Sequence, residues 1–167
     1  SYLNLANALI KNKKYAESIP IFKKLIKFFP NDHSILIHYA FSLIQLKDYE
    51  EALKVLKVSI EINPNQSDPY SLISDVYFNL NDNIKSIENL KKAILFDSQN
   101  DVFHNNLGRL YGEERHFIKA LSSFEKASLL NPKNHKAKYN QSLIHLRFGN
   151  FEKGWTLYEE GINENTR

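Results

Sequence analysis

The sequence feature that most constrains the fold is an internal repeat of 34 residues. Prolines stand at Pro30, Pro64 and Pro132, and the missing member of this series falls at Ser98. The sixteen-residue blocks that end at these four positions align without gaps, and a fifth copy begins at Phe151. A fixed period of this length is typical of chains that stack several copies of one small structural unit.

Each repeat predicts a pair of helices. The aligned blocks carry apolar residues three and four positions apart, which indicates an amphipathic helix. Further helical patterns fill the intervals between the blocks, for example over residues 33–46 and 101–114, and Asn-Pro dipeptides end two of the blocks. The sequence therefore predicts five antiparallel helix pairs in a single domain over residues 1–167, with repeats at about 1–32, 33–66, 67–100, 101–134 and 135–167.

Two columns of small residues fix the register of the repeats. The first column is Ala6, Ala40, Ser74, Gly108 and Ser142, and the second is Ser18, Ala52, Ser86, Ala120 and Gly154. Alanine, serine and glycine together make up only 28 of the 167 residues, so chance does not explain ten small residues in ten places. Small side chains allow helix backbones to approach closely, and we therefore expect these residues where helices cross.

These features resemble the tetratricopeptide repeat (TPR) family. Its signature is a large and a small residue in the first helix, an aromatic or leucine one turn later, and then a small residue, an aromatic and a proline in the second. One copy in this chain matches the signature at Leu107, Gly108, Tyr111, Ala120, Phe124 and Pro132. The resemblance covers essentially the whole chain. It implies an all-α fold, an α-solenoid of about five TPR helix-turn-helix repeats that forms a right-handed superhelix.

Four residues depart from the repeat pattern. Asn83 stands where the other copies have tyrosine or phenylalanine, which predicts a looser third turn. Gln141 and His145 replace apolar residues of the other copies, which predicts weaker packing of the last first helix. Pro20 falls inside a predicted second helix, where it removes one backbone donor and is expected to bend or loosen that helix.

The resemblance also implies where a partner would bind. TPR arrays hold an extended peptide or a partner helix on their concave side, which the first helix of each repeat lines. Residues three or four apart on such a helix share one face. The candidate groove residues on that face are Asn4, Asn7, His38, Phe41, Asp75, Asn105, Asn106, Arg109, Tyr139 and Asn140.

Asparagine recurs in one column of this predicted groove. Asn4, Asn106 and Asn140 occupy equivalent places, with His38 and Leu72 in the other two copies. An asparagine amide offers both a donor and an acceptor, so it can bracket a peptide group without contacting its side chain. The column resembles the asparagine ladder of the TPR arms of O-linked N-acetylglucosamine transferases. The alternative is composition alone, because asparagine accounts for 19 of the 167 residues.

The sequence contains no catalytic or metal-binding motif. It has no cysteine, which excludes disulfides, thiolate metal sites and cysteine nucleophiles. Its six histidines form no HExxH arrangement, and its glycines form no phosphate-binding loop. We therefore expect a protein that is not an enzyme, with no catalytic residue, no cofactor and no metal site.

Charge and hydropathy leave a protein or peptide as the expected partner. The net charge of +3 is small, and basic residues do not cluster with aromatic residues on one face, which argues against nucleic acid. No apolar run is long enough to insert into a membrane. The lysine and asparagine pattern with which chaperone co-factors of the family clamp a C-terminal carboxylate is not matched. The default location is cytoplasmic.

The last copy leaves two functions open. Residues 149–161 resemble the final repeat of bacterial TPR proteins, which often precedes a glycosyltransferase or another catalytic domain. The chain is then either a non-catalytic interaction scaffold or the substrate-recruiting arm of a multidomain enzyme, such as an O-GlcNAc-transferase-like glycosyltransferase. Trp155 and Tyr158 lie on a last helix that no further helix of this chain covers, which predicts self-association through the solenoid ends. Because Ser1 lies inside a predicted helix, we expect the chain to begin within a repeat of a longer protein.

Overall fold

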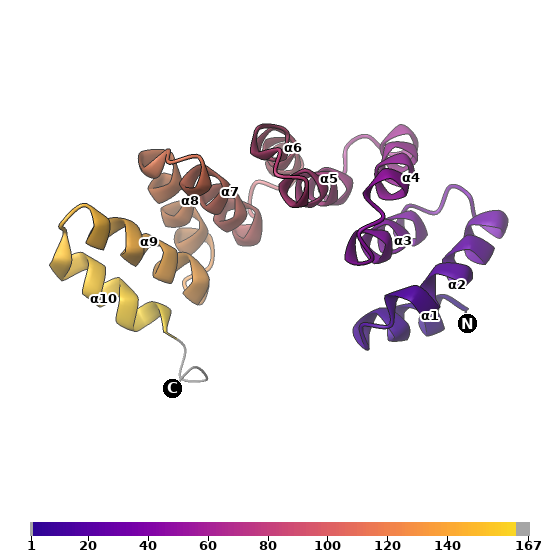
Figure 1. Cartoon of the computed structure of the whole chain (residues 1–167), viewed down its shortest axis with the longest axis horizontal. Coiled ribbons are helices and arrows are strands. Elements are labelled where there is room, and N and C mark those ends of the chain that lie inside the picture. Colours follow the sequence, from indigo (N-terminus) through magenta and orange to yellow (C-terminus); the bar gives the residue numbers. More distant parts are fainter. Residues whose placement is uncertain (1, 163–167) are drawn as a thin grey trace. The chain divides into compact units, whose positions relative to one another are not determined.

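The computed structural model describes residues 2–162, and these residues form ten α-helices and no strand (Figure 1). The chain divides into two compact units, residues 1–96 and 97–167. The first unit contains α1 (Tyr2–Lys11), α2 (Tyr15–Phe28), α3 (His33–Gln45), α4 (Tyr49–Ile62), α5 (Ser67–Asn79) and α6 (Asn83–Phe96). The second unit contains α7 (Asp101–Glu113), α8 (Phe117–Leu130), α9 (His135–Arg147) and α10 (Phe151–Gly161). Ser1, for which the sequence predicts a helical position, lies outside the described residues.

Within each unit, consecutive helices pack against one another. In the first unit α1 pairs with α2, α3 with α4 and α5 with α6, while α2 packs on α3 and α4 packs on α5. In the second unit α7 pairs with α8 and α9 with α10, while α8 packs on α9. Within each unit, a helix pair therefore buries its apolar face against the next pair, as a repeat fold requires. The predicted all-α fold of five helix pairs is confirmed. The prediction of a single domain over residues 1–167 stays a prediction.

The two columns of small residues lie where the helices of a pair meet. All ten residues are buried. In the third repeat the hydroxyl of Ser86 donates to the backbone carbonyl of Ser74 at 2.9 Å. In the fourth repeat a Cβ added at Gly108 would lie 2.6 Å from the ring of Phe124, closer than side chains pack. The columns therefore set the distance between paired helices, as the sequence predicts.

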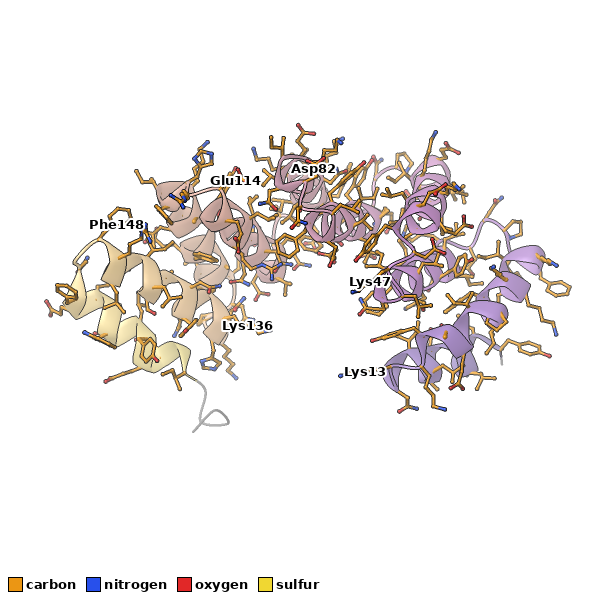
Figure 2. All side chains as sticks on the ribbon, in the orientation of Figure 1. Lys13, Lys47, Asp82, Glu114, Lys136 and Phe148 are labelled. Atoms are coloured by element: carbon orange, nitrogen blue, oxygen red, sulfur yellow. The ribbon has the colours of Figure 1, made fainter. Side chains whose placement is uncertain are left out.

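One turn geometry closes the first helix of every repeat. The residues at this turn have a positive φ, between 58° and 76°, and recur every 34 positions: Lys13, Lys47, Asn81, Arg115 and Gly149. In each case the next backbone N–H donates to the carbonyl five residues earlier, at 2.8–2.9 Å. This is the Schellman closure of a helix C-terminus, which places its left-handed residue most often at glycine. Lys13 and Lys47 mark two of the turns in Figure 2.

Two of the departures from the repeat pattern cause no disruption. The turn before Asn83 has the same geometry as the others, and the side chain of Asp82 accepts a hydrogen bond from the backbone N–H of Lys85 at 3.1 Å. The expectation of a looser third turn is therefore wrong, because an aspartate cap stabilises the start of α6. Helix α2 continues through Pro20 from Tyr15 to Phe28 without a break.

The two polar departures in α9 have different outcomes. Gln141 is buried, and its amide donates to the backbone carbonyl of Phe124 at 3.1 Å and to the hydroxyl of Ser128 at 2.6 Å. These bonds join α9 to α8, so the substitution does not weaken the packing as expected. His145 is also buried, and its Nε2 has no hydrogen-bond partner among residues 2–162. Burial, with a smaller contribution from the positive charge of Lys153, lowers the pKa of the His145 imidazole.

Candidate functional site

The second unit contains a hollow of about 650 Å³ between α7, α9 and the end of α10. Volumes of about 300–1,000 Å³ are usual for ligand sites. Most of its lining residues carry a polar or charged group, although apolar atoms form the larger part of the lining surface. The lining residues are Asn105, Asn106, Arg109, His135, Lys136, Tyr139, Asn140, Tyr158, Gly161 and Ile162.

Helix periodicity brings these side chains together. Asn105, Asn106 and Arg109 lie within one turn of α7, and Tyr139 and Asn140 lie within one turn of α9. The amide of Asn140 donates to Oδ1 of Asn105 at 3.2 Å, which joins the two helices. Asn105 is buried, and its side chain therefore acts mainly to hold Asn140 in place.

The amide of Asn106 is available to a ligand. Asn106 is half-buried and lines the hollow, and its side chain makes no hydrogen bond within residues 2–162. The bond to Asn105 uses only one N–H of the Asn140 amide, which leaves the Asn140 carbonyl oxygen to accept. Two asparagine amides from neighbouring first helices can therefore donate to and accept from one bound peptide group.

Aromatic and backbone contacts from α10 close one end of the hollow. The rings of Tyr139 and Tyr158 lie 5.6 Å apart between centroids. Gly161 allows this approach, because a Cβ there would lie 2.6 Å from the backbone nitrogen of Tyr139. The Nδ1 of His135 lies 2.8 Å from the backbone carbonyl of Glu160, to which it donates. The wall formed by these residues is closely packed and partly apolar.

Five of the ten predicted groove residues line this hollow, namely Asn105, Asn106, Arg109, Tyr139 and Asn140. The other five lie in the first unit. Asn4 and Asn7 are on α1, His38 and Phe41 are on α3, and Asp75 is on α5.

Two of the first-unit residues have contacts within their own unit. The Nδ1 of His38 donates to the backbone carbonyl of Ser34 at 2.8 Å. The ring of Phe41 packs edge-on against Tyr15, with centroids 6.1 Å apart. Both side chains are half-buried. These two positions therefore contribute to local packing, whereas three of their four counterparts in the second unit line the hollow, namely Asn106, Arg109 and Asn140.

The contribution of α10 to the hollow was not predicted from the sequence. Tyr158, Gly161 and Ile162 line the hollow from a second helix, whereas the prediction considered only first helices. A third column of small residues was available as a signal. It contains Ser59, Ala93, Ala127 and Gly161, with Leu25 in the first copy. Small residues at this column indicate a close approach between a second helix and its neighbours, which is what Gly161 provides.

The residues that the structure describes hold no group of three or more histidine and acidic side chains able to bind a metal ion. Within residues 2–162, no helix has both the length and the hydropathy needed to cross a bilayer.

Family comparisons identify the repeat. Three models described as tetratricopeptide repeat match residues 3–76, 67–100 and 105–162. Between them they cover all five helix pairs. The chain belongs to the tetratricopeptide repeat family, as its resemblance predicts. No curated protein matches the chain.

Solved structures of TPR proteins share the fold. MamA residues 41 to the end, from Desulfovibrio magneticus RS-1, superpose with a TM-score of 0.80 at 17% identity, covering 96% of this chain and 90% of that one. TTC0263, a thermophilic TPR protein of Thermus thermophilus, gives 0.78 at 19% identity, covering 96% and 88%. YrrB, described as a TPR protein with an unusual peptide-binding site, gives 0.70 at 17% identity, covering 96% and 83%. At these identities the similarity shows the fold.

Proposed function

We propose that this protein is a non-catalytic interaction module that binds an extended peptide segment in the hollow of its second unit. The observation that carries the proposal is the pair of amides at Asn106 and Asn140. Asn105 holds the second of them in place through the 3.2 Å hydrogen bond. The fold is consistent with this role, and the structurally similar YrrB is described as having a peptide-binding site.

The two amides bind the backbone of the peptide and not its side chains. A peptide group has one N–H and one carbonyl, and each asparagine amide can satisfy both. The rings of Tyr139 and Tyr158 provide an apolar surface beside the asparagines. An extended segment exposes its backbone groups, whereas a helix has already paired them internally. The hollow therefore suits an extended segment better than a partner helix.

The test is a paired substitution of the two asparagines. A phage-displayed library of dodecapeptides is selected on the full chain, and the best peptide is synthesised and titrated. Loss of about two neutral hydrogen bonds in N106A/N140A costs about 2 kcal/mol, so the Kd should rise about 30-fold. A double variant of two exposed asparagines outside the hollow, N12A/N150A, is the control and should bind as the parent does.

Equal binding by N106A/N140A and the parent would refute the role of the asparagine pair. Adding N4A to the double variant then asks whether the predicted asparagine column extends to the first unit. A further loss of affinity in the triple variant would extend the site to α1.

A second proposal is that two copies of this chain associate through the ends of their repeat arrays. Leu5 on α1 is 51% exposed, whereas its counterpart Tyr39 in the next repeat is 3% exposed. Trp155 on α10 is 56% exposed, whereas its counterpart Leu121 is half-buried. The two terminal helices thus expose positions that neighbouring repeats cover elsewhere, which supports stacking of α10 from one copy on α1 of another.

Light scattering tests this self-association. Stacking predicts a mass that rises with concentration in the parent and falls to that of one chain in W155E. A parent protein that stays monomeric at high concentration would exclude it. The substrate-recruiting arm of a glycosyltransferase stays a prediction that depends on the resemblance of the last repeat and of the asparagine column.

A further inference from the structure

The charges around the hollow are unbalanced. Among residues 2–162, its lining includes the basic residues Arg109 and Lys136 but no aspartate or glutamate. Lys136 is exposed at the start of α9, where Figure 2 labels it. It forms no ion pair within the part of the chain that the structure describes. The hollow therefore presents positive charge to whatever it binds.

A neighbouring lysine on the same helix has a different environment. The ammonium of Lys138 lies 2.7 Å from a carboxylate oxygen of Glu160, and its side chain is only 21% exposed. The backbone carbonyl of the same Glu160 accepts the Nδ1–H of His135. Glu160 is thus already engaged by two groups of α9, so the carboxylate at the edge of the hollow is committed to Lys138 and not to Lys136.

Lys136 and Asn140 lie one helical turn apart on α9, about 6 Å along the axis. Successive side chains of an extended peptide are about 3.3 Å apart along the chain. A segment whose backbone lies between Asn106 and Asn140 and runs along α9 toward Lys136 would place a side chain one or two residues away beside this lysine. The side chain that complements an ammonium group there is a carboxylate.

We propose that the hollow selects peptide segments with an aspartate or glutamate that pairs with Lys136, next to a peptide group held by Asn106 and Asn140. This inference rests on the proposed function and names its ligand class. An ion pair at a partly exposed site changes affinity by about fivefold, and salt weakens it.

The same charge could attract a nucleic acid, but the remaining features favour a peptide. Nucleic-acid affinity comes from many phosphate contacts along a basic surface. Here one of the two α9 lysines near the hollow is already neutralised by Glu160. The Asn106 amide and the carbonyl oxygen of Asn140 can also pair with the N–H and carbonyl groups of a peptide backbone.

The experiment compares a variant that removes the charge of Lys136 with a variant that removes the whole Lys138–Glu160 ion pair. Dodecapeptides selected from the phage library on the full chain should be enriched in aspartate and glutamate. The best peptide is compared with its amide analogue, in which each Asp is Asn and each Glu is Gln. The parent should bind the acidic peptide at least about fivefold more tightly than the analogue at about 50 mM salt, and the ratio should shrink at about 500 mM.

The variant K136Q should lose about fivefold in affinity for the acidic peptide and little for the analogue. The control K138Q/E160Q removes the neighbouring ion pair without changing the net charge, and it should keep the parent's preference. Three results would overturn the inference: enrichment without acidic residues, equal binding of the two peptides by the parent, or equal behaviour of K136Q and K138Q/E160Q. Competition by a dodecamer of thymidine as strong as by the acidic peptide would also overturn it in favour of nucleic acid.

These outcomes separate the inference from the proposed function. If neutral peptides are enriched and N106A/N140A loses them, the hollow binds peptides without an acidic preference. If no peptide is enriched, both proposals are wrong.

Discussion

The first-helix faces of the two units differ although both are built on the same 34-residue repeat. In the first unit His38 bonds to Ser34 and Phe41 packs on Tyr15, so these side chains are used within the unit. In the second unit Asn106 and Asn140 occupy the same column as His38, and both line a hollow of about 650 Å³. The repeat therefore fixes the helices, whereas the residues at the predicted groove positions differ in their contacts from one unit to the other.

The small-residue columns show the opposite behaviour, because they are buried in both units. A column that sets the helix spacing tolerates only Ala, Ser or Gly, whereas a groove position is free to vary without harm to the fold. Substitutions in the columns should therefore reduce stability and substitutions in the groove should reduce binding. The following predictions test this division, from the largest expected effect to the smallest.

The largest effect is expected at Gly108. A Cβ there would lie 2.6 Å from the ring of Phe124 and 3.0 Å from the backbone carbonyl of Ala120. The substitution G108V should therefore lower the free energy of unfolding by about 3 kcal/mol, measured by urea denaturation. The matched control on the same helix is G112A, because nothing lies within 4 Å of a Cβ at Gly112. G112A should stabilise the protein by up to about 1 kcal/mol. Equal effects of the two would contradict the spacing role of the column.

The next effect concerns His145, the buried polar residue of α9. Its pKa is lowered by burial and by Lys153, with an opposing contribution from Glu125. The unfolded chain therefore takes up a proton more readily than the folded one, and stability falls as the pH drops below the ordinary histidine value of 6.5.

The substitution H145L restores the apolar residue of the other repeats and removes an unsatisfied buried nitrogen. It should raise the free energy of unfolding by about 1–2 kcal/mol at pH 7. The gain over the parent should grow between pH 7 and pH 5, because the parent loses stability there and the variant lacks this histidine. Thermal melts of H145L and the parent at several pH values measure this difference in stability. A gain that is constant with pH would show that His145 does not control the acid sensitivity.

The smallest effect is expected at the turns. Lys47 has a φ of 63°, a conformation that asparagine and glycine adopt more readily than lysine. The equivalent positions carry Asn81 and Gly149. The substitution K47N should therefore stabilise the protein by about 0.5 kcal/mol. K57N, in the middle of α4, should instead destabilise it slightly because asparagine is a poorer helix former. Stabilisation by both variants would point to a general effect of lost charge.

Much of the fold could be predicted because the sequence repeats five times. One unusual residue, such as Asn83 or Pro20, carries little weight against a column that recurs in every copy. The turn geometry was missed because lysine or arginine stands at three of the five left-handed positions, and these residues give no local signal for a positive φ. The spacing between Asn81 and Gly149, two repeats apart, was the available clue.

The site was harder to predict because it depends on contacts between repeats. The periodicity identified Asn106 and Asn140 as groove residues, but it did not indicate that Asn105 bonds to Asn140. Nor did it indicate that Tyr158 and Gly161 of α10 complete the wall. Side-chain pairing between helices depends on small differences in distance, which sequence spacing does not specify.

Chemical-shift mapping tests the central claim most directly. The selected peptide is titrated into the full chain labelled with nitrogen-15, and the backbone and side-chain amide signals are followed. The account predicts the largest shifts at the side-chain amides of Asn106 and Asn140 and at the backbone around Lys136 and Tyr139, with small changes on α1 and α3. Large shifts on α1 and α3, with the Asn106 and Asn140 amides unmoved, would contradict it.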